Sequence, residues 1–430
     1  MLIPDNFFHI IYKLKSIIFI LIIFIYSSCN SKVDKKSNEN ITIPDGFTIT
    51  VFAEECGRAR HLAVNDNGDV YVALRSLKNG KGIAAFRDTD SDGKANIIKY
   101  FGDLPGTGIG IHKGYLYFGS DTSIVRYKLI PGELIPEGPP EKIVGGFELQ
   151  RQHAVKPFAF DDKGWMYVNV GAPSNACMEQ MRTPGSKGMD PCPLLEDYGG
   201  VWRFKAEQTG QDKQKDGYRF ATGIRNAVAI SWNELNSNLY VVQHGRDQLS
   251  QLWPKLFTNE QNAQLPAEEF FLVKDGMNFG WPYCYYDQLQ GKKVLAPEYG
   301  GDGKSTERCE NFEDPIMAFP GHWAPNDLLF YTANQFPEKY HGGAFIAFHG
   351  SWNRAPLPQQ GYKVVFVPFA DSLPSGKWED FAVGFPGKEE IKSSGDAKYR
   401  PMGLAQAPDG TLYISDSVKG RIWKIRYVGN

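Results

Sequence analysis

The sequence lacks the cysteine spacings that hold haem or zinc. None of its six cysteines forms a Cys-x-x-Cys or Cys-x-x-Cys-His motif, which excludes a covalently attached haem and a zinc ribbon within this chain. It also lacks an excess of charge, because the formal net charge is -2, so nothing predicts binding to nucleic acid or to an acidic surface. Any basic binding site must therefore be local.

Near the N-terminus, the apolar run Ile17 to Tyr26 is too short for a comfortable membrane span and has the length of a signal-peptide core. Small residues then precede Cys29, which resembles a bacterial lipobox with Tyr26 where leucine is usual. We expect residues 1–28 to be a lipoprotein-type signal peptide, Cys29 to be lipidated, and residues 29–42 to be a flexible tether. A plain secretory signal or an uncleaved anchor is the alternative.

The remaining cysteines suit an exported protein. In an oxidising compartment the near pairs Cys177 with Cys192 and Cys284 with Cys309 are candidate disulfides, which leaves Cys56 unpaired. Each bridge would contribute about 3 kcal/mol by restricting the unfolded chain. The sequence therefore predicts a periplasmic or outer-membrane-anchored bacterial lipoprotein, which meets the membrane through its lipid anchor only.

A strand-turn-strand unit recurs along a chain that is rich in glycine and aromatic residues. Three clear copies turn at Asn65–Gly68, Asp161–Gly164 and Pro408–Gly410, where Asx or Pro-Asp residues precede glycine between alternating apolar and polar runs. Looser copies begin at Gly108, Asn226 and Asp327. About six such units, each too small to bury its own faces, favour an all-β propeller with long inserted loops over residues 43–430. A pair of β-sandwiches is the competing fold.

Basic or imidazole side chains precede the inner strand of three units. They are His153, Arg225 followed by Asn226, and Arg400, and a propeller would bring them together at its axis. Guanidinium groups bind carboxylates bidentately, and imidazole can act as a general base near neutral pH. Each residue by itself would more often be a loop brace, so the hypothesis depends on the repetition at equivalent positions.

Two loops could bind a cation through oxygen atoms. The segment Asp88 to Asn96 resembles a calcium loop, but Lys99 stands where an EF-hand needs glutamate, so a turn capped by aspartates is at least as probable. The second loop offers the carbonyl of Gly245 and the carboxylate of Asp247. An ordinary charged loop explains the second segment equally well.

Several motifs in order give the chain a family resemblance. The motifs are GIRNAVAI, the DG-x-LY turns, FGWPYC, FYTANQFPEKYHGGAFIAFHGSWNR, GYKVV and YRPMGLAQAPDGTLYISD. Together they resemble the PQQ-dependent soluble sugar dehydrogenase family, especially its sorbosone dehydrogenase-like branch, over about Ile43 to Tyr427. The resemblance implies a six-bladed β-propeller with pyrroloquinoline quinone (PQQ) and Ca²⁺ over the central axis.

The resemblance also implies roles for individual residues. The family's catalytic histidine falls on His153, its arginine-asparagine pair on Arg225 and Asn226, and its final-blade arginine on Arg400. The resemblance further implies that the calcium-side loop falls on Gly245 and Asp247, and that the HGSWNR run places His349 and Arg354 near the cofactor carboxylates.

The implied reaction is oxidation of an aldose sugar or a sorbosone-like aldehyde to the lactone or acid, with His153 as general base and hydride transfer to PQQ. Electrons would then pass to an external acceptor, a cytochrome or a quinone. Two other functions stay open. One is a metal-dependent lactonase-type propeller hydrolase, and the other is a non-catalytic, surface-tethered binding propeller.

Overall fold

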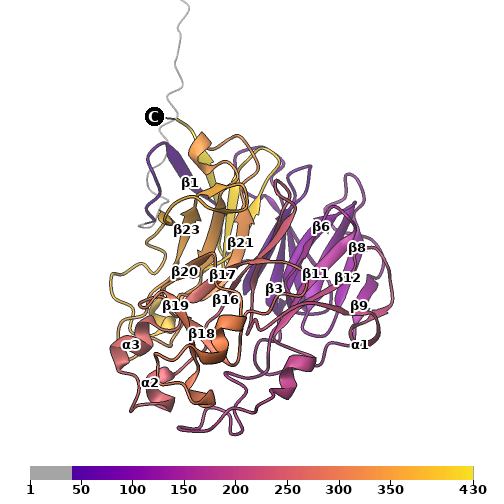
Figure 1. The fold of residues 1–430 in the computed structure, drawn as a ribbon. Helices are drawn as coiled ribbons and strands as arrows, with labels where there is room; N and C mark the ends of the chain where they lie inside the picture. Colours follow the sequence, from indigo (N-terminus) through magenta and orange to yellow (C-terminus); the bar gives the residue numbers. More distant parts are fainter. Residues whose placement is uncertain (1–40, 430) are drawn as a thin grey trace, which may run out of the picture. The chain divides into compact units, whose positions relative to one another are not determined.

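The computed structural model describes residues 41–429 and shows a six-bladed β-propeller (Figure 1). The first three blades contain these elements: blade 1, β2 (Ala59–Val64), β3 (Val70–Lys78), β4 (Lys81–Arg87) and β5 (Ile97–Phe101); blade 2, β6 (Gly106–His112), β7 (Tyr115–Ser120), β8 (Ile124–Lys128), β9 (Glu141–Gly145) and the short parallel β13 (Gln211–Asp212); blade 3, β10 (Phe158–Phe160), β11 (Trp165–Val170), β12 (Gly200–Lys205) and β14 (Tyr218–Thr222).

The other blades follow in chain order: blade 4, β15 (Ala229–Asn233), β16 (Asn238–Gln243), β17 (Glu268–Val273) and β20 (Met317–Phe319); blade 5, β21 (Pro325–Phe330), β22 (Ala344–Phe348), β23 (Lys363–Val367) and β26 (Glu379–Ala382); blade 6, β27 (Pro401–Gln406), β28 (Leu412–Asp416), β29 (Ile422–Tyr427) and β1 (Phe47–Ala53). Because β1 pairs antiparallel with β29, the first strand of the chain completes the last blade and closes the ring.

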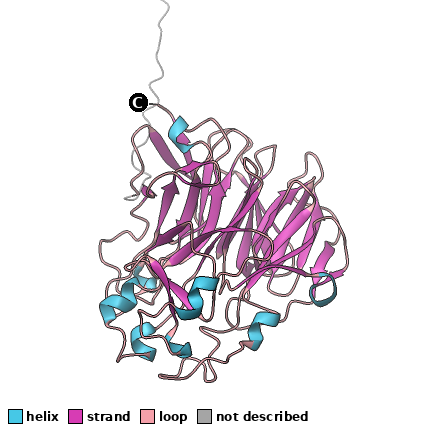
Figure 2. Ribbon diagram, in the orientation of Figure 1, coloured by secondary structure: helices cyan, strands magenta, loops and turns pink. Residues whose placement is uncertain are grey.

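Helices and small hairpins lie outside the blades: α1 (Lys213–Asp216), α2 (Leu249–Leu252), α3 (Asn259–Gln264), the 3₁₀ helices Pro193–Glu196, Pro297–Tyr299, Glu307–Asn311, Glu338–Tyr340 and Ser394–Asp396, and the hairpins β18 (Cys284–Asp287) with β19 (Lys292–Leu295) and β24 (Phe369–Ala370) with β25 (Leu373–Pro374). Figure 2 shows most of these helices gathered along one side of the strands, where the long loops also run.

The predicted turns join the inner two strands of their blades. In blade 3 the turn links Phe160 to Met166, and the Asp161 carboxylate accepts the backbone N–H groups of Lys163 and Trp165 at 2.9 and 2.8 Å. Gly164 takes a φ of +83°, a conformation that disfavours other residues. The same Asx-and-glycine chemistry closes the hairpins of blades 1 and 6, so the repeat found in the sequence is the inner hairpin of each blade.

Packing between blades supplies the core, and side chains also fill part of the axis. Val155, Val228 and Met402 come from blades 3, 4 and 6 and form one buried cluster. Since these residues belong to blades that are not all neighbours, their contact marks the centre of the ring.

Both expected disulfides are present. Cys177 is bonded to Cys192, and Cys284 is bonded to Cys309, while Cys56 is a buried free thiol. All four bonded cysteines pack in one apolar cluster with Trp281. Each disulfide closes its own loop, and the two loops pack against each other in this cluster.

The closing strand gives a direct test of the ring. Ile49 on β1 is 2% exposed within the cluster between blades 5 and 6. Ile49→Ala should lower the free energy of unfolding by about 2 to 5 kcal/mol, because it leaves a cavity in a packed core. Thr50→Ala on the same strand removes an exposed side chain and serves as the control, with little change expected. Equal melting temperatures of the two variants would contradict the packing described for β1.

Candidate functional site

A polar cavity of about 270 Å³ lies among the loops of blades 3, 4 and 5. Its lining residues are Gln152, His153, Arg182, Arg225, His244, Gly245, Asp247, Glu268, His322, Ala324, Ser351 and Trp352. Three histidines, two arginines and two carboxylates thus surround one small volume. Four of the residues predicted for the site, His153, Arg225, Gly245 and Asp247, are brought together here.

His153 precedes β10 and takes a left-handed backbone conformation, with φ of +54°. Its Nδ1 lies 2.5 Å from the carbonyl oxygen of Ala172. Because a carbonyl can only accept, Nδ1 donates and Nε2 keeps its lone pair. Burial, followed by the nearby Arg225 charge, lowers the pKa of His153 to about 3. The ring is therefore neutral at physiological pH and able to accept a proton at Nε2.

Close packing fixes the position of this histidine. A Cβ atom placed on Gly171 would lie 2.6 Å from the Cβ of His153 and 2.6 Å from Oδ1 of Asn226. Only glycine fits between these two side chains. Asn226 itself is 3% exposed, and its Oδ1 accepts a hydrogen bond from Asn169 at 3.2 Å. Asn226 therefore supports the wall of the cavity and is not one of the residues that line it.

Arg225 is buried, and the protein already uses most of its donors. Its Nε donates to the Asn175 carbonyl at 3.1 Å, Nη1 donates to the Gly245 carbonyl at 2.8 Å, and Nη2 donates to the Asn175 side chain and to Asp247 at 3.0 and 2.9 Å. A guanidinium has five N–H groups, so a single one remains for a ligand. The expected bidentate clamp on a carboxylate is not available in this conformation.

Asp247 is the anionic centre of the cavity. One carboxylate oxygen accepts from Arg225 at 2.9 Å and from Arg182 at 2.6 Å, and the other accepts from the amide of Asn353. Burial alone would raise the pKa of Asp247, but Arg225 and Arg182 hold it below the ordinary value. Asp247 is therefore a permanent carboxylate at neutral pH.

Arg400 and His349 lie together but are not among the residues that line this cavity. Arg400 stands directly before β27, as predicted, and its guanidinium donates to the carbonyls of His349 at 3.0 Å and Gly350 at 2.5 Å. The His349 ring bonds to the Ser417 hydroxyl at 2.6 Å. Three N–H groups of Arg400 have no protein acceptor among the described residues.

Arg354 is buried and bonded to protein carbonyls. It is 3% exposed, and its guanidinium donates to the carbonyl oxygens of Ala263 and Pro358. These bonds hold the loop after β22 against α3. Arg354 does not line the cavity, and the family motif gave no sign of this because the Ala263 carbonyl comes from a distant segment of the chain.

Four lining residues with ionisable side chains were not singled out in the sequence: Arg182, His244, Glu268 and His322. His322 precedes an inner strand, β21, so the rule that selected His153 and Arg400 would have found it. His244 directly precedes Gly245 of the candidate calcium loop. Arg182 and Glu268 carry no such signal, because a disulfide-linked loop and the third strand of blade 4 bring them to the cavity.

The extra histidines have fixed tautomers. Nε2 of His244 bonds to the Pro325 carbonyl at 2.8 Å, and Nε2 of His322 bonds to the carbonyls of Asn262 and Leu265 at 2.8 and 3.0 Å. Both Nε2 atoms must therefore donate. Burial lowers the pKa of His244 to about 4 and also lowers that of His322, so both rings are neutral hydrogen-bonding groups at physiological pH.

Oxygen donors for a hard cation are present in the cavity. Gly245 offers its carbonyl and Asp247 its carboxylate, and both atoms already accept hydrogen bonds. Glu268 is 2% exposed, accepts the backbone N–H groups of Gly245 and Ala324 at 2.8 and 3.0 Å, and has no ion-pair partner in residues 41–429. Two carboxylates and a carbonyl are a donor set suited to Ca²⁺.

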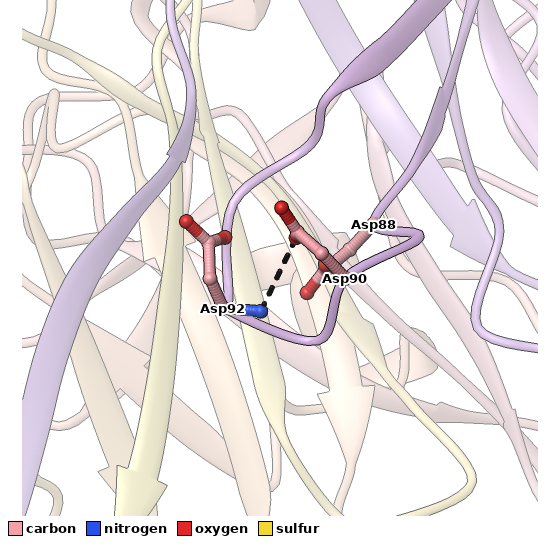
Figure 3. Close-up of side chains that lie close together, drawn as sticks. All are labelled: Asp88, Asp90 and Asp92. Carbon is pink, nitrogen blue, oxygen red and sulfur yellow. Dashed lines mark hydrogen bonds between the residues drawn. The ribbon is translucent and has the colours of Figure 1, made fainter.

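The other calcium-like loop has the form of a capped turn. Figure 3 shows Asp88, Asp90 and Asp92 on this turn of blade 1, with their carboxylate oxygens within 4.8 Å of one another. Each aspartate accepts a nearby backbone N–H group, from Gly93, Asp92 and Lys94 respectively. These bonds match the alternative prediction of an Asp-capped turn.

The predicted lipidation site, Cys29, and the signal peptide lie outside the described residues. Within residues 41–429, no helix has the length and apolar character to cross a membrane.

The family described as TrAA12-like matches residues 41–428. A PQQ-dependent pyranose dehydrogenase from Coprinopsis cinerea is 27% identical over 236 residues, which cover 47% of this chain and 30% of that protein. The chain aligns with half or less of the length of the curated relatives that it matches.

Solved structures share the fold. The PQQ domain of the C. cinerea pyranose dehydrogenase, in its holo form, has a TM-score of 0.72 at 21% identity and covers 90% of this chain and 97% of its own. The soluble aldose sugar dehydrogenase of Escherichia coli, in its apo form, has a TM-score of 0.56 at 16% identity, with 89% and 99% covered. At these identities the likeness demonstrates a common propeller.

Removing the Asp247 charge tests the network. Asp247→Asn should lower stability by about 3 to 5 kcal/mol at neutral pH, because Arg225 and Arg182 lose their buried counter-charge. The depressed pKa of Asp247 means that this stability is present above the ordinary carboxyl pKa and is lost as pH falls through the folded value. The difference in melting temperature between wild type and Asp247→Asn should therefore be smaller at about pH 3 than at pH 7.

Asp190→Asn is the matched control, since Asp190 forms an exposed ion pair with Arg308 and should contribute at most about 1 kcal/mol. An Asp247→Asn protein as stable as this control at pH 7 would contradict the account of the network.

Proposed function

The chain belongs to the TrAA12-like family, and on that premise we propose that it is a PQQ-dependent oxidoreductase acting on an aldose sugar or a sorbosone-like sugar aldehyde. The observation that carries this proposal is the neutral His153, whose free Nε2 belongs to a cavity with buried arginines and carboxylates. Such a cavity can take a proton from a sugar hydroxyl and hold an anionic cofactor.

His153 is the proposed general base. Its Nδ1–H bond to Ala172 orients the ring, and Nε2 removes the hydroxyl proton at the anomeric carbon of a sugar, or from the hydrate of an aldehyde. PQQ, when bound, supplies the quinone that accepts the hydride, and a bound Ca²⁺ polarises that quinone. The substrate loses one proton and one hydride, so the product is a lactone or an acid.

Residues on both sides of the axis would hold the cofactor. Arg400, with its three free N–H groups, is better placed for a carboxylate than Arg225, which has one. Gly245, Asp247 and Glu268 would hold Ca²⁺. Asn226 and Arg354 would act indirectly, because their polar atoms bond to protein groups and neither residue lines the cavity.

The cellular setting is also a proposal. Export through residues 1–28, lipidation at Cys29 and a tether to residue 42 would present the propeller of residues 43–430 outside the cytoplasmic membrane. A cytochrome or quinone would receive the electrons. Contact with the membrane would be through the lipid anchor only.

Reconstitution tests the proposed function. Purified protein loaded with PQQ and CaCl₂ should show a bound-cofactor spectrum and should reduce an artificial electron-accepting dye when an aldose or sugar aldehyde is added. Removal of Ca²⁺ with a chelator should abolish dye reduction. Binding of neither PQQ nor Ca²⁺ would favour the non-catalytic propeller, and metal-dependent lactone hydrolysis without dye reduction would favour the hydrolase.

His153→Ala tests the base. The variant should bind PQQ as wild type does and lose at least a hundredfold in kcat, the usual scale for removing a general base, about 10²- to 10⁴-fold. His341→Ala is the matched control, since His341 is exposed and bonds to the Phe336 carbonyl. Unchanged turnover in His153→Ala would remove His153 from the reaction.

A further inference from the structure

The turn that carries His153 has three consecutive carbonyl groups outside any β ladder. They belong to Gln152, His153 and Ala154, which precede β10, and no backbone N–H group within residues 41–429 donates to them. The φ of His153 is +54°, a conformation that few residues other than glycine adopt. Because backbone carbonyls that leave water need hydrogen-bond donors, this turn depends on side chains.

Gln150 supplies most of these donors. Its Nε2 lies 2.6 Å from the carbonyl oxygen of Gln152, 3.0 Å from that of His153 and 2.8 Å from that of Gly171. An amide has two N–H groups, which the three carbonyls share. Gly171 directly precedes Ala172, whose carbonyl accepts the Nδ1–H group of His153. Gln150 therefore joins the backbone of His153 to the segment that orients its ring.

Lys156 supplies the donor for the third carbonyl. Its side chain is fully buried, its ammonium donates to the Ala154 carbonyl, and its Nζ lies 5.5 Å from the centre of the Phe147 ring. No carboxylate of residues 41–429 forms an ion pair with it, and burial lowers the pKa of Lys156 to about 8. A buried ammonium without a carboxylate partner is costly, so a contribution to stability does not by itself explain this lysine.

We infer that Gln150 and Lys156 are positioning residues for His153. They stand three residues before and three residues after it, and together they bind the carbonyls of its turn, so the ring keeps one orientation. Neither side chain lines the cavity, so each acts through His153. The inference rests on the proposed function, in which Nε2 of His153 accepts the substrate proton.

Gln150→Glu tests this role with almost no change in size. The carboxylate has no N–H group and repels the carbonyl oxygens, so kcat should fall by about tenfold or more, because a misplacement near 1 Å can cost about 10²-fold. Gln211→Glu is the matched control. Nε2 of Gln211 also donates to three carbonyls, those of Ile143, Lys205 and Gln208, and Gln211 does not line the cavity. This control should lose stability and keep its kcat.

Lys156→Met is a second, independent variant, which also serves if Gln150→Glu does not fold. Methionine fills the buried space and removes the donor to the Ala154 carbonyl. We expect kcat to fall while the Kd for PQQ keeps its wild-type value. The matched control is Lys213→Met, since Lys213 is also buried and donates to Asp197 at 2.6 Å. Its loss should lower the melting temperature and leave kcat unchanged.

The tautomer of His153 gives a readout that needs neither cofactor nor turnover. In the apoprotein at pH 7, ring ¹⁵N spectra should show Nδ1 protonated and Nε2 unprotonated, and His153→Ala assigns these signals by their loss. In Gln150→Glu and Lys156→Met the ring should exchange between both tautomers, which moves the two nitrogen signals toward each other. Gln211→Glu and Lys213→Met should keep the wild-type signals.

The outcomes separate this inference from the proposed function. Ring signals that shift in Gln150→Glu and Lys156→Met without a change in turnover would support the positioning role and remove His153 from the reaction. Wild-type ring signals in both variants would overturn the inference, and the proposed function would stand if wild type oxidises sugars with PQQ. A loss of turnover no greater than that of the two controls would also overturn it, because it would indicate a general structural role.

Discussion

The cavity depends on one half-buried carboxylate, that of Asp247, and on the two arginines that share it. Arg225 comes from the segment before β15, Arg182 from the loop that the Cys177–Cys192 disulfide closes, and Asn353 from the loop after β22. Charges taken out of water are costly unless they are paired and hydrogen-bonded. Satisfying Asp247 therefore forces three distant segments into one arrangement, and that arrangement shapes the cavity.

This constraint also separates the roles of the surrounding groups. Arg225 donates four of its five N–H groups to protein atoms. Its main role is therefore to organise the loop, because a single N–H group remains for a ligand. The same charge, together with burial, keeps His153 neutral and its Nε2 able to accept a proton. Free guanidinium donors lie elsewhere, on Arg400. The arginine that organises the cavity, the proposed base and the guanidinium donors that are free to bind an anionic cofactor therefore belong to different blades.

The sequence predicted the fold well because its signals are local. Asx and glycine residues at hairpin turns act within a few residues, so the inner hairpins were recognised, and spacing alone paired the four cysteines correctly. The site was predicted in part. His153 and Arg225 do line one cavity. However, Arg225 and Arg354 donate hydrogen bonds to carbonyl oxygens that lie far from them in the sequence. Glu268 was missed because only the folded propeller brings it to the cavity.

The most direct test of the whole account is a crystal structure of the protein grown with PQQ and CaCl₂. The account predicts density for the cofactor in the cavity between His153 and the Gly245–Asp247 loop, with Ca²⁺ bound by oxygen atoms of that loop. A cavity that stays empty at a saturating PQQ concentration, or a cofactor bound on another face of the propeller, would contradict it.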